Sequence, residues 1–420
     1  MDSTHYTNLL EALVQVPDPR KAKGKQHEWR IVLAALCAGM ASGQRSVRAI
    51  AQWVREHEEE LIQQLRPTKQ RLPSAATLYR VLRAIDAETV ESQLSSLARY
   101  SYSSTEDEDQ QAREKQACHI RGVKHKHQRK PKQTWKDKYK SRLRLVGLVG
   151  QSIDGKELRG ARAHGRPICL VSLVRHGSGI VLGQKAVERK SNEIKAVPPL
   201  LQGRDLAGTV TTMDALLTQR AIAQQIVNGG GHYLMAVKAN QRQLCLAAAE
   251  LFADPPWLAH EQGANYRRFC KVEKGHGRVE KRTLESSPAL REYMQEYLHW
   301  PGGEQVMRRT CRRVTVKTGE VSEEVKYGVT SLGWEEADAE ELEGLWREHW
   351  TIENRVHYVR DVTMGEDANQ MRVGNAPQVM AALRNAILNL IRKKGWTNIA
   401  DGLRHYAAFP QRALSLISSP

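Results

Sequence analysis

The order of strand and helix signals between residues 147 and 238 constrains the fold of this chain more than any other part of its sequence. Three consecutive apolar runs, separated by short turns that contain glycine, predict three strands. They cover residues 147–154, 167–176 and 179–187. Helical and strand-like patterns then alternate, which is typical of a mixed sheet whose later strands are parallel. This second part comprises a helix at 193–201, a strand at 207–214, a helix at 219–227 and a strand at 232–238.

Two of these predicted strands end on an aspartate. Asp154 ends the first strand, and Asp214 ends the strand at 207–214. In α/β sheets, ligands bind beyond the carboxyl ends of the strands, so the two carboxylates could hold Mg²⁺ or Mn²⁺ there. Two such ions would activate a water or a 3′-hydroxyl and stabilise the leaving oxygen of an attack on phosphorus. An aspartate at a strand end can also simply cap a turn, and both interpretations stay open at this point.

A third acid, Glu353, lies in a basic segment that predicts a helix from Glu336 to Arg360, bent or interrupted near Trp350–Thr351. We expect Trp350 to lie in the core. We also expect His357 and Asp361 to pair, because they are one helical turn apart. The basic neighbours of Glu353 are Arg347, His349, Arg355, His357 and Arg360.

Between the two halves of this α/β pattern, residues 243–332 contain a helix and then short alternating runs with hairpin-like turns. They predict a β-rich insertion that returns to the core through Tyr327–Leu332. Two more helices are predicted near the end of the chain, at 376–394 and 399–408.

The charge of the chain favours a polyanionic partner. It has 64 Lys and Arg against 47 Asp and Glu, a net charge of +17, which indicates nucleic acid before a membrane surface. Residues 113–144 hold thirteen of the basic residues and two acids, a local charge of +11. With almost no apolar periodicity, residues 101–145 predict a disordered arm that lies along DNA phosphates. Candidate contacts in this arm are Arg129, Lys130 and Lys132.

The first hundred residues predict an all-helical region that binds DNA. Residues 73–85 contain a good N-cap, Ser74, and resemble the second helix of a helix-turn-helix, from which Thr77, Arg80 and Arg83 project and Arg80 would reach DNA. An ordinary amphipathic helix with solvated arginines fits the same pattern equally well. No secretory signal pattern and no apolar run of membrane-spanning length is present, and the six cysteines show no metal-binding spacing. We therefore expect a cytoplasmic protein with no membrane partner, associated with the nucleoid when it binds DNA.

Four ordered motifs resemble those of the ISAs1-type transposases, or H-repeat-associated proteins, of the IS4-like DDE class. They are IDGKELRGA at 153–161, the run at 212–241 that begins TMDALLTQ, the run at 349–391 that begins HWTIENRVHYVRD, and the N-terminal stretch at 18–53. The resemblance implies an RNase H-like core with the acidic triad Asp154, Asp214 and Glu353, each a catalytic residue and a metal ligand. It also implies cleavage of DNA at transposon ends with two Mg²⁺ or Mn²⁺ ions, strand transfer, and a homodimer or larger assembly on DNA. A nuclease without strand transfer and a domesticated DNA-binding regulator are the alternatives.

This interpretation of the sequence divides the chain into six parts. They are a helical DNA-binding region at 1–100, the arm at 101–145, the first part of the core at 146–242, the insertion at 243–332, the second part of the core with the Glu353 helix at 333–395, and a helical tail at 396–420.

The wider class places a tyrosine, an arginine and a basic residue at fixed offsets from its glutamate. Here Trp346 and His349 stand at the first two positions, while Arg360 fits the third. The departure leaves the handling of the DNA ends open. The remaining predicted DNA contacts are Lys156, Arg159, Lys238, Asn240, Arg347, His349 and Arg360.

Overall fold

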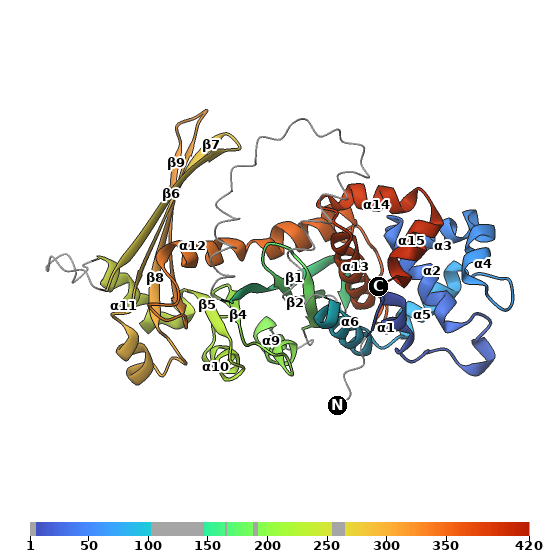
Figure 1. Cartoon of the computed structure of the whole chain (residues 1–420), viewed down its shortest axis with the longest axis horizontal. Coiled ribbons are helices and arrows are strands. Elements are labelled where there is room, and N and C mark those ends of the chain that lie inside the picture. The colour runs from blue at the N-terminus through green and yellow to red at the C-terminus, as the bar shows by residue number, and fades with distance from the viewer. Residues whose placement is uncertain (1–5, 102–146, 164–165, 188–191, 254–264, 420) are drawn as a thin grey trace. The chain divides into compact units, whose positions relative to one another are not determined.

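The computed structural model describes residues 6–101, 147–163, 166–187, 192–253 and 265–419 (Figure 1). The predicted basic arm, with Arg129, Lys130 and Lys132, lies outside these residues. The chain divides into two compact units, which are described separately. The first unit comprises Met1–His127, Gly155–Ala196 and Thr351–Pro420, and the second comprises Gln128–Asp154 and Val197–Trp350.

The N-terminal part of the first unit is helical, as its periodicity predicts. Side-chain caps start two of the helices: Asn8 accepts a hydrogen bond from the backbone N–H of Glu11, and Ser46 accepts one from that of Ala49. The helices are α1 (Leu9–Val14), α2 (Trp29–Ala41), α3 (Val47–Glu56), α4 (Glu58–Leu65), α5 (Ala75–Ala84) and α6 (Ala87–Ser101).

These helices share one hydrophobic core with the end of the chain. The C-terminal helices are α13 (Ala376–Lys393), α14 (Ile399–Ala407) and α15 (Pro410–Ser418). Figure 1 shows them in red beside the blue N-terminal helices. Helix α2 is buried on nearly every side, because its apolar run contacts α3, α13 and α15. Side chains as far apart in sequence as Leu36, Leu388 and Ile417 are buried in the same cluster.

The mixed sheet contains nine strands in the order β3-β2-β1-β4-β5-β9-β8-β7-β6. Strand β1 pairs in parallel with β4, and β4 pairs in parallel with β5, whereas β2 and β3 are antiparallel. The order 3-2-1-4-5 with these directions is that of an RNase H-like sheet, which confirms the predicted fold class. The bounds of these five strands are β1 Val149–Ala163, β2 Arg166–Arg175, β3 Val181–Ala186, β4 Thr209–Met213 and β5 His232–Val237. The helices between them are α9 (Glu193–Leu201) and α10 (Arg220–Asn228).

The predicted insertion extends this sheet within the second unit. After α11 (Arg242–Ala253), strands β6 (Arg267–Gly275), β7 (Arg278–Ser287), β8 (Gln305–Thr315) and β9 (Val321–Thr330) form an antiparallel meander. The end of β9 pairs with β5, with Tyr327 opposite Val237 and Thr330 opposite Leu234. The return to the core at Tyr327 is therefore confirmed.

Helix α12 (Ala339–Glu348) packs on the sheet of the second unit through Leu342, Leu345 and Trp346. A capping box starts it: the Asp338 carboxylate accepts from the Glu341 backbone N–H, and the Glu341 carboxylate accepts from that of Asp338. The helix ends at Glu348, and two π-helical segments follow, η6 (Ile352–His357) and η7 (Val359–Thr363). The predicted interruption near residues 350–351 is confirmed. The predicted burial of Trp350 is wrong, because its side chain is 52% exposed.

One buried acid in the first unit gives a test of the fold. Glu91 of α6 accepts a hydrogen bond of 2.8 Å from Gln184 Nε2 of β3. Burial raises the pKa of Glu91 from its ordinary 4.5 to about 7. The folded chain therefore holds a proton there that the unfolded chain loses, so this group makes stability fall as pH rises from about 4.5 to about 7.

Glu91→Gln removes this proton linkage and keeps a hydrogen-bond acceptor. We expect the variant to exceed the wild type by roughly 3 kcal/mol in unfolding free energy at pH 8, and to differ little at pH 4.5. Urea denaturation at the two pH values measures the difference. Glu88→Gln, at an exposed position of the same helix, is the control. An equal difference at both pH values would show that Glu91 is not the group that titrates.

Candidate active site

Asp154 and Asp214 occupy neighbouring positions on adjacent strands of the second unit. In the parallel pairing of β1 with β4, the last matched residues are Ile153 and Met213. Each is followed directly by one of the two aspartates, and neighbouring strands lie about 4.8 Å apart. The sheet therefore brings two carboxylates together where the β1–β4 ladder ends.

The prediction that Asp154 ends its strand is wrong, although the side chain is at the expected edge. Strand β1 continues through Asp154 to Ala163. Only β4 stops, at Met213, so the end of the pairing rather than the end of the strand places Asp154 beside Asp214. Sequence periodicity detects how long a strand is and not how far its partner accompanies it.

Asp214 also caps a turn, as the alternative interpretation proposed. Its Oδ1 accepts a hydrogen bond of 3.1 Å from the backbone N–H of Leu217. The backbone oxygen of Asp214 accepts another, of 2.9 Å, from the Thr218 hydroxyl. A carboxylate has about four lone-pair positions, so this cap fixes the side chain and leaves acceptor capacity for a cation.

His349 ties the end of α12 to the two strands, a contact that sequence reasoning missed. Its Nδ1 lies 3.0 Å from Thr212 Oγ1, and its backbone oxygen accepts a hydrogen bond of 3.2 Å from Ser152 Oγ. Ser152 and Thr212 each precede a site aspartate by two residues and are buried. The structure thus gives His349 a positioning contact at the place where a DNA contact was predicted. The only sequence signal was its fixed offset of four residues before Glu353.

Glu353 lies on η6 in the first unit with its side chain 49% exposed. Its Oε2 is 3.0 Å from Nδ1 of His357, which is buried. This hydrogen bond is the main cause that lowers the pKa of Glu353, and the positive charges of Lys156 and Arg159 lower it further. Burial lowers the pKa of His357. The arrangement favours an ionised Glu353 beside a neutral His357.

The predicted pairing of His357 with Asp361 is corrected. His357 pairs with Glu353 and not with Asp361. Asp361 instead pairs with Lys156, whose Nζ lies 2.5 Å from its Oδ2. Lys156 is 8% exposed and Asp361 is half-buried, so this ion pair gives Lys156 a structural role, and its phosphate contact stays a prediction. Arg159, three residues further along β1, has a side chain that is 82% exposed and lies 3.8 Å from Asp367, so its DNA contact stays a prediction.

Arg360 is fully buried, which argues against its predicted contact with DNA. Its guanidinium forms an ion pair of 2.6 Å with Glu366, which also pairs with Arg384 at 3.1 Å. Gln184 and Asn385 accept further hydrogen bonds from Arg360. The charge of this arginine is therefore neutralised inside the first unit. Glu366 serves as its partner.

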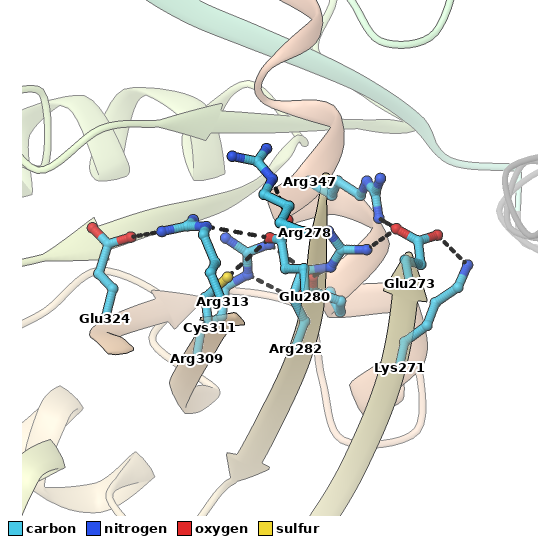
Figure 2. A network of polar contacts seen from close by, with 11 residues as sticks. Lys271, Glu273, Arg278, Glu280, Arg282, Arg309, Cys311, Arg313, Glu324 and Arg347 are labelled. Carbon is cyan, nitrogen blue, oxygen red and sulfur yellow. Dashed lines mark hydrogen bonds and ion pairs between the residues drawn. The ribbon is translucent and has the colours of Figure 1, made fainter. Parts of the chain in front are cut away.

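Arg347 belongs to a network of charged side chains in the second unit (Figure 2). Its Nη1 lies 2.7 Å from Glu273 Oε2, and Arg282 pairs with the same carboxylate. The deepest member of the network is Glu343, which accepts two hydrogen bonds from Arg309, of 2.6 and 2.8 Å. This pairing gives Arg347 a structural role beside its predicted contact with DNA.

Three other predicted contacts are exposed. Lys238 follows the end of β5, and Asn240 donates a hydrogen bond of 2.6 Å to the backbone oxygen of Ala215, directly after Asp214. Arg80 lies on α5 of the first unit.

Trp346, at the other departure from the class pattern, is buried. It packs against β9 at Gly328, where a Cβ would lie 2.5 Å from the indole ring.

Comparisons with known proteins agree on one family. A family model described as DDE_Tnp_1-associated matches residues 10–98, and one described as Transposase DDE domain matches residues 82–390. YncI of Escherichia coli O157:H7 is 35% identical over 57% of this chain and 61% of its own length. The H repeat-associated protein YhhI of E. coli strain K12 is 32% identical over 57% of this chain and 63% of its own. Both names contain the word transposase, and the chain spans about three fifths of each relative.

One solved structure resembles the chain more distantly. A piggyBac transposase in a synaptic complex with hairpin DNA aligns with 98% of this chain and 76% of its own, at a TM-score of 0.41 and 9% identity. A likeness of this size bears on neither fold nor function. Among the residues that the structure describes, no helix is long and apolar enough to cross a membrane.

Proposed function

We propose that this chain, which belongs to the Transposase DDE domain family, cleaves DNA at transposon ends and joins the freed ends to target DNA. Asp154, Asp214 and Glu353 form its acidic triad in this proposal. The observation that carries it is the parallel pairing that ends at Ile153 and Met213, because it makes Asp154 and Asp214 neighbours.

Two features of the chain connect Glu353 with this pair. His349, bonded to Thr212 and to Ser152, has helical backbone angles, as does Thr351. Glu353 follows the anchored residue by four positions in the chain. Lys156 also lowers the pKa of Glu353 and follows Asp154 by two positions on the same strand. We therefore propose Glu353 as the third member of the triad.

The donor set suits Mg²⁺ or Mn²⁺, because three carboxylates offer the hard oxygen ligands that these ions prefer. The lowered pKa of Glu353 keeps its carboxylate ionised, which binding requires. We propose that Asp154, Asp214 and Glu353 hold two ions. When bound, such ions supply a deprotonated water or 3′-hydroxyl and stabilise the leaving oxygen.

The chain's own residues would orient the site. Leu217 fixes the carboxylate of Asp214 through its backbone N–H, and His357 fixes that of Glu353. Arg159 is exposed on the strand that carries Asp154 and can contact a DNA phosphate. Joining two ends to one target requires two sites, so we propose a homodimer or larger assembly on DNA. We also propose that the chain acts in the bacterial cytoplasm and is associated with the nucleoid when it binds DNA.

Labelled DNA ends incubated with the protein, Mg²⁺ and a target plasmid test the proposal. Joined products are expected. Nicks without joining would support a nuclease on the same core, whereas binding without any cleavage would support a DNA-binding regulator and contradict the enzymatic proposal.

A further inference from the structure

We propose that an arginine-lined groove in the first unit is a binding site for the phosphate backbone of duplex DNA. The groove has a volume of about 640 Å³. Its walls come from α3, α5 and the segment 365–376, which begins just after η7. Several of these residues lie in the region 1–100 that was predicted to bind DNA, but the groove itself was not predicted. The identification of the anion as DNA rests on the proposed function, but the groove itself does not.

The charge of the groove has one sign. Four arginines line it, Arg45, Arg48, Arg83 and Arg372, and no aspartate or glutamate does. All four are exposed. Within the described part of the chain, no carboxylate forms an ion pair with any of them, whereas Arg360 and Arg384 nearby in sequence are neutralised by Glu366. Four uncompensated guanidinium groups around one concavity indicate an anionic ligand of more than one charge.

The walls of the groove are held in place by backbone contacts. Asn375 donates from its backbone N–H to the oxygen of Arg83, at 3.3 Å, and from its side chain to the oxygen of Ile85, at 2.8 Å. Gly374 has a φ of +58°, and a Cβ there would lie 2.4 Å from the Arg83 oxygen. The segment therefore approaches α5 as closely as only glycine permits. This fixed spacing distinguishes the groove from a chance gathering of surface arginines.

The lining chemistry matches a phosphodiester strand. Guanidinium groups recognise phosphate through paired N–H donors, and the Tyr79 hydroxyl can donate to a further phosphate oxygen. Ser46 caps the first turn of α3, so the positive end of that helix dipole faces the same groove. Tyr79 and Arg83 are one turn apart on α5. Arg83 is also one turn from Arg80, the residue that the helix-turn-helix interpretation selected, but Arg80 does not line the groove.

The chain supplies a matched pair of double variants in the N-terminal helical region. Arg48→Gln/Arg83→Gln removes two charges from the groove. Arg55→Gln/Arg71→Gln removes two exposed charges outside it, at positions that were not predicted to contact DNA. Binding of a fluorescent 20-base-pair duplex is measured by anisotropy between 50 and 300 mM NaCl, without divalent ions. We expect the groove variant to lose roughly 10–100-fold in affinity at 100 mM salt and to flatten the salt slope by about 2. The control variant should stay within about threefold of the wild type.

Equal affinities and equal salt slopes for the two double variants would overturn the proposal. So would displacement of a bound fluorescent anion from the groove by poly-glutamate but not by DNA, because the partner would then be an acidic protein. Circular dichroism melts confirm that both variants are folded. Binding is scored without cleavage, so loss of DNA affinity in a chain that never cuts DNA would uphold the groove and reject the proposed activity. Normal cleavage together with unchanged binding by the groove variant would reject the groove as a DNA site and uphold the proposed activity.

Discussion

Asp154→Asn and Asp214→Asn are each expected to lower the rate of metal-dependent DNA cleavage by roughly 10³-fold or more. The reason is that each removes a charged oxygen ligand from a set that acts as a unit. Neither change alters side-chain volume, and an amide can keep the cap to Leu217, so the melting temperature and DNA affinity should stay near wild-type values. Single-turnover cleavage of a labelled end measures the rate.

The double variant makes this prediction sharper. The effects of substituting residues that act together are not additive. The double variant Asp154→Asn/Asp214→Asn should therefore cleave no more slowly than either single variant. Glu157→Gln, at an exposed position three residues beyond Asp154 on β1, is the control and should cleave normally. A single variant with more than a tenth of wild-type activity would remove that aspartate from the triad.

Glu366→Gln is expected to destabilise the first unit by about 3–5 kcal/mol. Glu366 is 4% exposed and neutralises both Arg360 and Arg384, and breaking a buried ion pair from one side leaves uncompensated charge. Although burial alone would raise the pKa of Glu366, the two arginines bring it below its ordinary value. The stabilisation is therefore present above the ordinary pKa of 4.5 and is lost as pH falls through the lower folded value.

Urea denaturation at pH 7 and at acid pH measures this effect. Glu60→Gln, at an exposed position of α4, is the control and should change stability by less than about 0.5 kcal/mol. If Glu366→Gln melts like the wild type but loses divalent-ion binding, the carboxylate is a ligand and not the partner of the arginines.

The elements that position the site were largely predictable, because they depend on local patterns. Strand periodicity with Asp214 at a strand end, the return of the insertion at Tyr327 and the interruption after α12 all follow from residues that are close in sequence. The place of Asp154 within β1 did not follow, because it depends on where β4 stops.

The structural roles of the charged residues could not be predicted either, because they depend on partners that are distant in the sequence. From the sequence alone, Lys156 is expected to be a solvated charge. Only the fold shows that it pairs with Asp361, which lies 205 residues later. Arg360 carries the same charge as Arg83, and only burial beside Glu366 distinguishes a structural arginine from one available to DNA. The arginine groove is likewise formed by helices and a segment that lie almost 300 residues apart in the chain.

The most direct test of the triad is a crystal structure of the protein soaked with Mn²⁺ and measured at the manganese absorption edge. The proposed function predicts anomalous peaks with oxygen ligands from Asp154, Asp214 and Glu353, at about 2.1 Å. Manganese bound at the two aspartates while Glu353 coordinates nothing, or bound only elsewhere in the chain, would contradict it.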